Sequence, residues 1–224
     1  MSEKTKESLK IVSQEEIGKN IFSMWLQADH MSANAKPGQF LSLYTRDGSK
    51  LLPRPISICE IDRENGRIRL VYRVTGKNTG TEAFSRLHPG VTIETLGPLG
   101  NGFPLKEAEG KKVFLIGGGI GIPPMLETAK ELNADKTVVL GYRDELFLKD
   151  EFEKYADVYV ATEDGSAGTR GNVLDAIREN ALKADVIFAC GPTPMLRALK
   201  NFAEENNITC WISMEERMAC GIGA

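Results

Sequence analysis

The sequence of 224 residues is 42% hydrophobic and 26% charged, which is ordinary for a globular protein with a buried core. Its net charge of −3 provides no general attraction for nucleic acid, so nucleic-acid binding is not expected. No apolar run approaches the roughly 18 residues needed to cross a membrane, and the first residues lack the apolar segment of a secretion signal, so we expect a cytoplasmic protein without a membrane anchor.

The first half of the chain predicts six short strands. They are expected at residues 10–12, 21–27, 40–44, 56–61, 67–74 and 92–96, and turn signals rich in proline, glycine and asparagine lie between several of them. In the fifth strand, one face carries Ile68, Leu70, Tyr72 and Val74, and the other carries Arg67, Arg69 and Arg73. This alternation predicts one core face and one polar face, and six such strands predict a small antiparallel barrel.

An arginine stands between two prolines at the mouth of the fourth expected strand, in Pro53-Arg54-Pro55-Ile56-Ser57. Prolines fix their own φ and favour an extended conformation in the residue before them, so the Arg54 backbone should be nearly rigid. A guanidinium fork held in one direction suits a phosphate. An edge strand that prolines block and an arginine keeps soluble is the alternative interpretation.

A second phosphate signal follows the fifth strand, in Gly76-Lys77-Asn78-Thr79-Gly80-Thr81-Glu82. Thr79 and Glu82 have the spacing of a capping box, which predicts a short helix over residues 83–87. Free backbone N–H groups near Gly80 and Thr81 could receive a phosphate. A plain capped helix that closes the barrel is the alternative, although the Arg54 and Gly80 signals support each other.

The second half of the chain alternates strands with helices. Residues 97–104 are too rich in glycine and proline for regular structure and predict a junction between domains 1–104 and 105–212. Strands are then expected at 113–116, 137–142, 158–162, 186–190 and 209–213, and helices at 123–132, 149–155, 172–180 and 195–206. This order predicts a doubly wound parallel sheet, which binds ligands at the carboxyl ends of its strands.

Three segments stand at those strand ends. The first strand leads into the glycines Gly117, Gly118, Gly119 and Gly121, but Ile122 occupies the third glycine position of the dinucleotide fingerprint. This glycine-rich loop indicates one of two roles. Its backbone approaches a pyrophosphate closely, or the glycines only form a turn that allows tight helix packing. Residues 162–166 and Cys190-Gly191-Pro192 should face the same crevice, where Cys190 is either an inert buried thiol or the floor under a nicotinamide ring.

Acyl transfer and zinc chemistry are not expected, because the sequence shows no Ser-His-Asp arrangement and its two histidines, His30 and His88, lie apart. The cysteines Cys59, Cys190, Cys210 and Cys220 show no close pairing, so no disulfide framework is expected either.

Taken in order, these motifs resemble the ferredoxin reductase family of flavoproteins. The resemblance rests on Arg54-Pro55-Ile56-Ser57, Gly80-Thr81, the glycine loop through Pro124, and Cys190-Gly191-Pro192-Thr193-Pro194-Met195. Within that family, the ending from Ser213 to Ala224 resembles the electron transfer subunits of dihydroorotate dehydrogenase B.

The resemblance implies that FAD is held by the barrel and NAD(H) by the α/β domain. Arg54 would bind the FAD pyrophosphate, and the flavin and phosphates would meet Pro55, Ile56, Ser57, Val71, Tyr72, Arg73, Gly80 and Thr81. The loop before Gly80 is longer than the family's Gly-x-Gly-Thr, which shifts its alignment by a residue or two. NADH would lie on the glycine loop and on Cys190-Gly191-Pro192, and Arg143 could meet the adenosine of either NAD or NADP.

Such subunits also carry a [2Fe-2S] cluster held by four cysteines that begin C-x4-C-x2-C. Cys220 matches the first ligand, and the next would be residue 225, whereas the sequence stops at Ala224. We therefore expect residues 213–224 to be the start of a truncated cluster segment, and no cluster in this chain.

The family mechanism is hydride transfer from NADH to the flavin N5, with the protein supplying position and electrostatics. Electrons would then pass through the cluster to an FMN-containing dihydroorotate dehydrogenase catalytic subunit in pyrimidine biosynthesis, in a possible dimer of heterodimers. Two alternatives remain open: an electron-transfer subunit of a sulfide dehydrogenase or hydrogenase complex of the same family, and a non-catalytic flavin-binding module.

Overall fold

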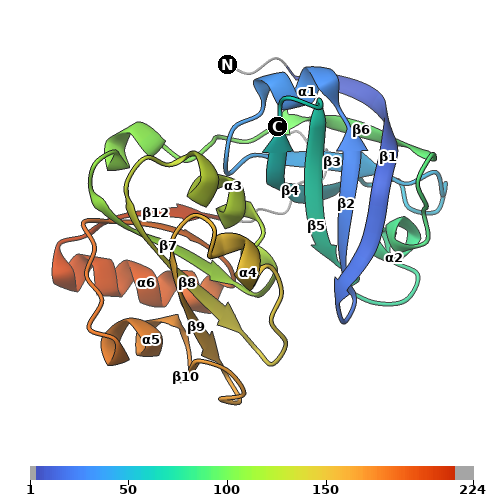
Figure 1. The fold of residues 1–224 in the computed structure, drawn as a ribbon. Helices are drawn as coiled ribbons and strands as arrows, with labels where there is room; N and C mark the ends of the chain where they lie inside the picture. The colour runs from blue at the N-terminus through green and yellow to red at the C-terminus, as the bar shows by residue number, and fades with distance from the viewer. Residues whose placement is uncertain (1–3, 215–224) are drawn as a thin grey trace. The chain divides into compact units, whose positions relative to one another are not determined.

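The computed structural model describes residues 4–214, which form two compact units (Figure 1). One unit ends at Gly102 and the other begins at Phe103. In the described residues, no helix is both long enough and apolar enough to span a membrane.

The first unit is the predicted six-stranded antiparallel barrel. Its strands close in the order β1-β2-β5-β4-β3-β6, and every neighbouring pair is antiparallel. Their bounds are β1 Thr5–Gly18, β2 Ile21–Gln27, β3 Phe40–Tyr44, β4 Arg54–Asp62, β5 Arg67–Arg73 and β6 Thr92–Leu99, and two short helices, α1 Asp29–Asn34 and α2 Gly80–Ser85, complete the unit. Closure leaves the barrel without an open sheet edge.

The alternation expected in β5 is confirmed on its core face, where Ile68, Leu70 and Tyr72 are all buried. The opposite face is not simply solvated, because Arg69 is only 6% exposed. Its Nε donates to Ser23 Oγ over 2.9 Å, and its Nη1 lies 3.5 Å from Glu60 Oε2. The neighbouring strands β2 and β4 thus supply the polar partners that allow this arginine to be buried.

The expectation that residues 97–104 have no regular structure is wrong in its first part, because β6 continues through Leu99. Gly97 pairs with Thr5 of β1, and Leu99 pairs with Phe40 of β3. A side chain at Gly97 would overlap that of Leu41, so this glycine is explained by packing inside a strand. The first strand is also much longer than the expected residues 10–12, and α1 was not expected.

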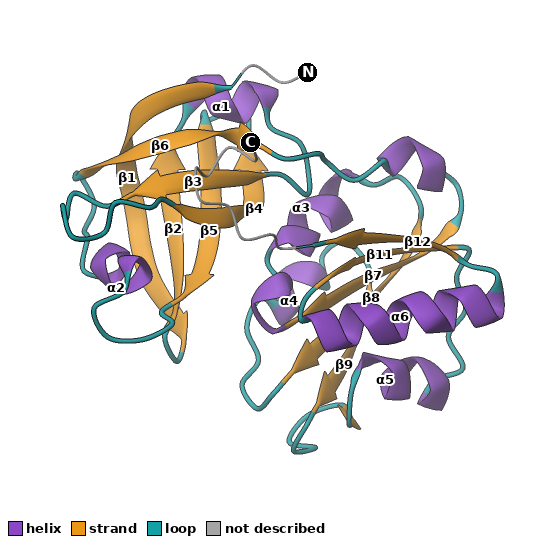
Figure 2. Cartoon of the chain, turned by 180° about the vertical axis from the view of Figure 1, so that it is seen from behind, coloured by secondary structure: helices purple, strands orange, loops and turns teal. Residues whose placement is uncertain are grey.

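The second unit is the predicted doubly wound parallel sheet, in the order β10-β9-β8-β7-β11-β12. Its strands are β7 Lys112–Gly118, β8 Asp135–Tyr142, β9 Asp157–Thr162, β10 Thr169–Arg170, β11 Val186–Cys190 and β12 Thr209–Ser213, of which only the two-residue β10 was not expected. The helices are α3 Pro124–Glu131, α4 Lys149–Phe152, α5 Val173–Glu179 and α6 Thr193–Asn206. Figure 2 shows α5 and α6 on one face of this sheet and α3 and α4 on the other.

The order in which strands are added to this sheet reverses at β7, although all the strands stay parallel. From β7 the chain proceeds outward to β8 and β9, and it then crosses back to β11 on the other side of β7. The carboxyl ends of β7 and β11 therefore form the switch point, which is where open α/β sheets bind their ligands.

Candidate cofactor and nucleotide sites

In the barrel unit, the structure brings into contact Arg54 and Gly80, which carry the two phosphate signals of the sequence. Arg54 is the first residue of β4, and its Nη1 donates to the Leu52 carbonyl over 2.7 Å. A Cβ atom placed on Gly80 would lie 2.7 Å from Arg54 Nε and 2.9 Å from its Cγ. The guanidinium thus rests on the first turn of α2, at a place that only glycine leaves open.

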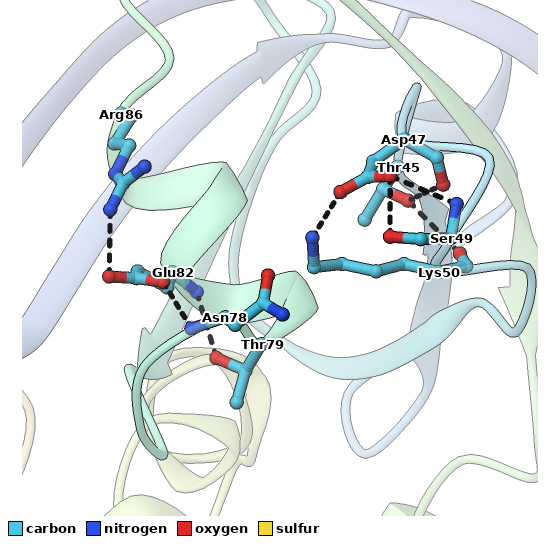
Figure 3. Close-up of polar contacts among 8 residues, drawn as sticks. All are labelled: Thr45, Asp47, Ser49, Lys50, Asn78, Thr79, Glu82 and Arg86. Atoms are coloured by element: carbon cyan, nitrogen blue, oxygen red, sulfur yellow. Dashed lines mark hydrogen bonds and ion pairs between the residues drawn. The ribbon is translucent and has the colours of Figure 1, made fainter.

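The start of α2 is built as a cap, which the sequence predicted in part (Figure 3). The Thr79 side chain accepts from Glu82 N over 3.2 Å, but the Glu82 carboxylate accepts from Asn78 N, one residue before the expected partner. Arg86 Nη2 also donates to Glu82 Oε1 over 2.8 Å. The helix begins at Gly80 and not at residue 83, so Gly80 and Thr81 are its first residues, whose N–H groups have no partner within a helix.

The Thr81 hydroxyl is used inside its own loop. It accepts from Thr75 N over 3.3 Å and lies 3.2 Å from Thr79 Oγ1, and the residue is 7% exposed. At this position, the backbone is the group that is left for a ligand.

A second tight turn, which was not predicted from the sequence, precedes Arg54 (Figure 3). The Asp47 carboxylate accepts from Ser49 N over 2.9 Å, from Ser49 Oγ over 2.6 Å and from Lys50 Nζ. The Lys50 ammonium and the Ser49 donors hold the pKa of Asp47 well below its ordinary value. The Asp-x-Ser spacing was the local signal that could have revealed this turn.

The strand segment Val71-Tyr72-Arg73 divides between two environments. Tyr72 is 1% exposed in the barrel core, stacked on Phe22 at 5.9 Å and edge-on to Phe84 at 6.2 Å. Burial raises the pKa of its hydroxyl above the ordinary value. Val71 is buried and Arg73 is exposed. Any ligand on the outside of the barrel can therefore meet Tyr72 only through its backbone.

The remaining candidates of this unit, Pro55, Ile56 and Ser57, continue β4 behind Arg54. They pair with Ser42, Leu41 and Phe40 of β3. The ladder fixes the direction of this segment relative to Arg54.

In the second unit, the glycine loop meets the end of β11. A side chain on Gly121 would overlap the Cys190 carbonyl, and one on Gly118 would lie 2.6 Å from Met195 Sδ. Close packing therefore explains these glycines, as the more modest interpretation held. Gly119 differs, because its φ is +53° and no atom lies within 4 Å of the place where its Cβ would be. The loop is thus both tightly packed and open at one point.

Cys190 is the last residue of β11, where this strand meets the glycine loop. It is 4% exposed and pairs in register with Gly117 of β7. A side chain on Gly191 would lie 2.5 Å from Met195 Cε and 3.1 Å from Gly118 N, so the Cys190-Gly191-Pro192 segment and the glycine loop are brought together as predicted.

Hydrogen bonds of Ser166 connect the loops that follow β8 and β9. Ser166 Oγ donates to Asp164 Oδ1 over 2.7 Å and lies 3.3 Å from the Asp144 carbonyl oxygen, and the two hydrogen bonds from Ser166 to Asp164 lower the pKa of that carboxyl. Arg143 follows β8 and is exposed. These loops lie at the same edge of the sheet as the glycine loop, because β7, β8 and β9 are parallel neighbours.

Two family models match the chain, one for each unit. An oxidoreductase FAD-binding domain matches residues 8–103, and an oxidoreductase NAD-binding domain matches residues 115–201.

Among curated proteins, a "Dihydroorotate dehydrogenase B (NAD(+)), electron transfer subunit" of Geobacillus sp. (strain WCH70) is 43% identical over 97% of this chain and 86% of its own length. The protein of the same name from Bacillus mycoides (strain KBAB4) is 42% identical over 98% of this chain and 86% of its own length. The chain belongs to the family of dihydroorotate dehydrogenase B electron transfer subunits. As a member, it is an FAD-dependent oxidoreductase subunit that uses NAD(H).

Solved structures of related oxidoreductases share the fold of this chain. A chain of the NADH-dependent reduced ferredoxin-NADP oxidoreductase, studied for flavin-based electron bifurcation, is 32% identical with a TM-score of 0.85, covering 96% of this chain and 79% of that chain. A ferredoxin NADP+ reductase from Neisseria gonorrhoeae shares the fold, with a TM-score of 0.77 at 16% identity over 93% of this chain and 99% of that chain.

The iron-sulfur prediction for this electron transfer subunit falls on Cys220, which lies outside the described residues. Within residues 4–214, no group of three or more His, Cys, Asp or Glu side chains is arranged to hold a metal ion.

Proposed function

We propose that this subunit passes electrons between NAD(H) on its parallel-sheet unit and an FMN-containing dihydroorotate dehydrogenase catalytic subunit, by way of FAD on its barrel. The names of the relatives support this partner, because they are electron transfer subunits of dihydroorotate dehydrogenase B. The complex would act in the cytoplasm, in pyrimidine biosynthesis, as a dimer of heterodimers.

The observation that carries the FAD site is the contact between Arg54 and Gly80. The guanidinium fork and the first backbone N–H groups of α2 lie together, and no side chain at Gly80 stands between them. A diphosphate fits this set of donors, since arginine and backbone N–H groups are its usual partners. Arg54 would hold the pyrophosphate with Gly80 and Thr81, while Pro55, Ile56, Ser57, Val71, Tyr72 and Arg73 would line the rest of the cofactor.

NADH would bind at the switch point of the parallel sheet. The open side of Gly119 leaves backbone accessible there, and Gly117, Gly118 and Gly121 keep the loop close to Cys190, Gly191 and Pro192. Bound FAD would accept a hydride from the nicotinamide and release electrons one at a time. The described residues contribute position and phosphate binding, and none of them is required as an acid or base.

The test is an anaerobic titration of the FAD-loaded chain with NADH, followed by flavin absorbance. Arg54→Ala should lose most of the flavin, whereas the control Arg178→Ala should keep it, because Arg178 lies on α5 of the other unit and its side chain is 63% exposed. A flavin that never bleaches would support the non-catalytic module instead. Retention of FAD by Arg54→Ala would remove the proposed site.

A second candidate function is an electron-transfer subunit of a bifurcating NADH-dependent complex. It is favoured by the 32% identity to the reduced ferredoxin-NADP oxidoreductase chain. Co-purification of the full complex and its activity decide between the two. Orotate formation from dihydroorotate with NAD+ supports the first function, and NADH-dependent reduction of another acceptor without orotate chemistry supports the second.

A further inference from the structure

We propose that Gln14 is a positioning residue of the FAD site, which holds α2 so that Gly80 stays against the Arg54 guanidinium. The inference rests on the proposed function, because it takes the Arg54 and Gly80 contact as the pyrophosphate site. It assigns a role to a residue of β1 that lies outside the Arg54, Gly80, glycine-loop and Cys190 motifs.

The side-chain amide of Gln14 joins three parts of the barrel unit. Its Nε2 donates to the Phe84 carbonyl over 3.0 Å and to the Leu87 carbonyl over 2.7 Å, at the end of α2. Its Oε1 accepts from the hydroxyl of Tyr72, the last residue but one of β5, over 3.0 Å. Both amide donors and the amide oxygen are thus used, and the network connects β1, β5 and α2.

The helix α2 needs such support because it has only six residues. A helix of this length is not stable alone, and its last carbonyls lack donors within the helix. Thr79 and Glu82 cap its start, and Gln14 supplies donors at its end. Phe84, which is 1% exposed, packs edge-on against Tyr72, so the same end is also held by the core.

The two ends of α2 are mechanically linked, since Gly80 and Phe84 lie in one helix. The space between Gly80 and the Arg54 side chain is too small for a methyl group. A small tilt of α2 therefore changes the distance between the guanidinium and the first N–H groups of the helix. Removal of the Gln14 donors frees the far end of the helix and should therefore weaken phosphate binding at the near end.

The variants separate the hydrogen bonds that Gln14 donates to α2 from the one that it accepts from Tyr72. Gln14→Glu keeps the size of the side chain and its acceptor for Tyr72, but it loses both donors to α2. Gln14→Leu loses all three hydrogen bonds. Glu15→Gln, at the neighbouring exposed position of β1, is the matched control.

The experiment measures the affinities of the deflavinated chain for FAD and for riboflavin by flavin fluorescence. Riboflavin keeps the isoalloxazine ring but lacks the pyrophosphate. We expect Gln14→Glu and Gln14→Leu to lower the ratio of FAD to riboflavin affinity by about tenfold, and Glu15→Gln to leave it unchanged. Equal losses for both ligands, or no loss, would overturn the proposal, because a merely structural role does not discriminate between the ligands.

Two further measurements keep the result interpretable. Hydrogen exchange in the FAD-loaded chain should accelerate in residues 80–87 of the Gln14 variants and not in β12, and unchanged exchange in residues 80–87 would also count against the proposal. Arg54→Ala in the same titration tests the site itself. If Arg54→Ala leaves the ratio unchanged, the proposed function fails, whereas an effect of Arg54→Ala without one of Gln14→Glu contradicts the role of Gln14 alone.

Discussion

Replacing Gly80 by alanine perturbs the proposed pyrophosphate site by a single methyl group. The new Cβ would lie 2.7 Å from Arg54 Nε, 2.9 Å from Cγ and 3.2 Å from Cζ, so the middle of the arginine side chain must move. Gly80 has no left-handed φ, and alanine should favour the helix by up to about 1 kcal/mol. Overpacking costs about 1–3 kcal/mol. These effects largely cancel, so the free energy of unfolding should change by no more than about 2 kcal/mol.

FAD affinity should respond much more strongly than stability. A displaced guanidinium loses a charge-assisted hydrogen bond to the pyrophosphate, which is worth about 1.5–3 kcal/mol and corresponds to an increase in Kd of roughly 10-fold to 150-fold. The assay is a fluorescence titration of the deflavinated chain with FAD, next to a thermal unfolding curve of the same sample.

The matched control is Gly48→Ala, where no atom lies within 4 Å of the added Cβ. It should change neither FAD affinity nor stability appreciably. If Gly80→Ala binds FAD as tightly as the unmodified chain, the guanidinium contact has nothing to do with the cofactor, and the reasoning is refuted.

Three other predictions concern the rest of the fold. Gly121→Ala should lose NADH-dependent flavin reduction and about 3 kcal/mol of stability, because the methyl group meets the Cys190 carbonyl; normal reduction kinetics would contradict this. Arg69→Met should destabilise the barrel by about 3 kcal/mol in urea unfolding, since it leaves the Glu60 carboxylate without this cation, and a double-mutant cycle with Glu60→Gln should show coupling. The pKa of Asp47 lies below its ordinary 3.8 in the folded chain, so its turn is stabilised above pH 3.8 and loses that stabilisation as pH falls through the lower folded value; an NMR titration of Asp47 with an ordinary midpoint would disprove it.

The sequence predicted the barrel well because the relevant signals are local. The turns at Pro37-Gly38 and Asn65-Gly66 separate runs of alternating hydrophobicity, and the expected bounds of β2 and β3 match the structure. The Thr79 cap was also local, since its partner Glu82 lies three residues away. Signals of this kind depend only on neighbours in the chain.

The features that were missed depend on distant partners. Gln14 lies 58 residues from Tyr72 and 73 residues from Leu87, so nothing near it in the sequence indicated a hydrogen-bond network. Arg69 looked like one more solvated arginine, and its burial depends on polar side chains of β2 and β4, which are distant in the sequence. The continuation of β6 through Gly97 was hidden because glycine normally signals a turn, whereas here it makes room for Leu41.

The most direct test of the central claim is the anaerobic NADH titration of the FAD-loaded chain, compared with its Arg54→Ala variant. NADH should bleach the flavin absorbance of the unmodified chain, and the variant should retain little FAD. A chain that binds FAD but stays oxidised in excess NADH would contradict the claim that this subunit transfers electrons from NADH.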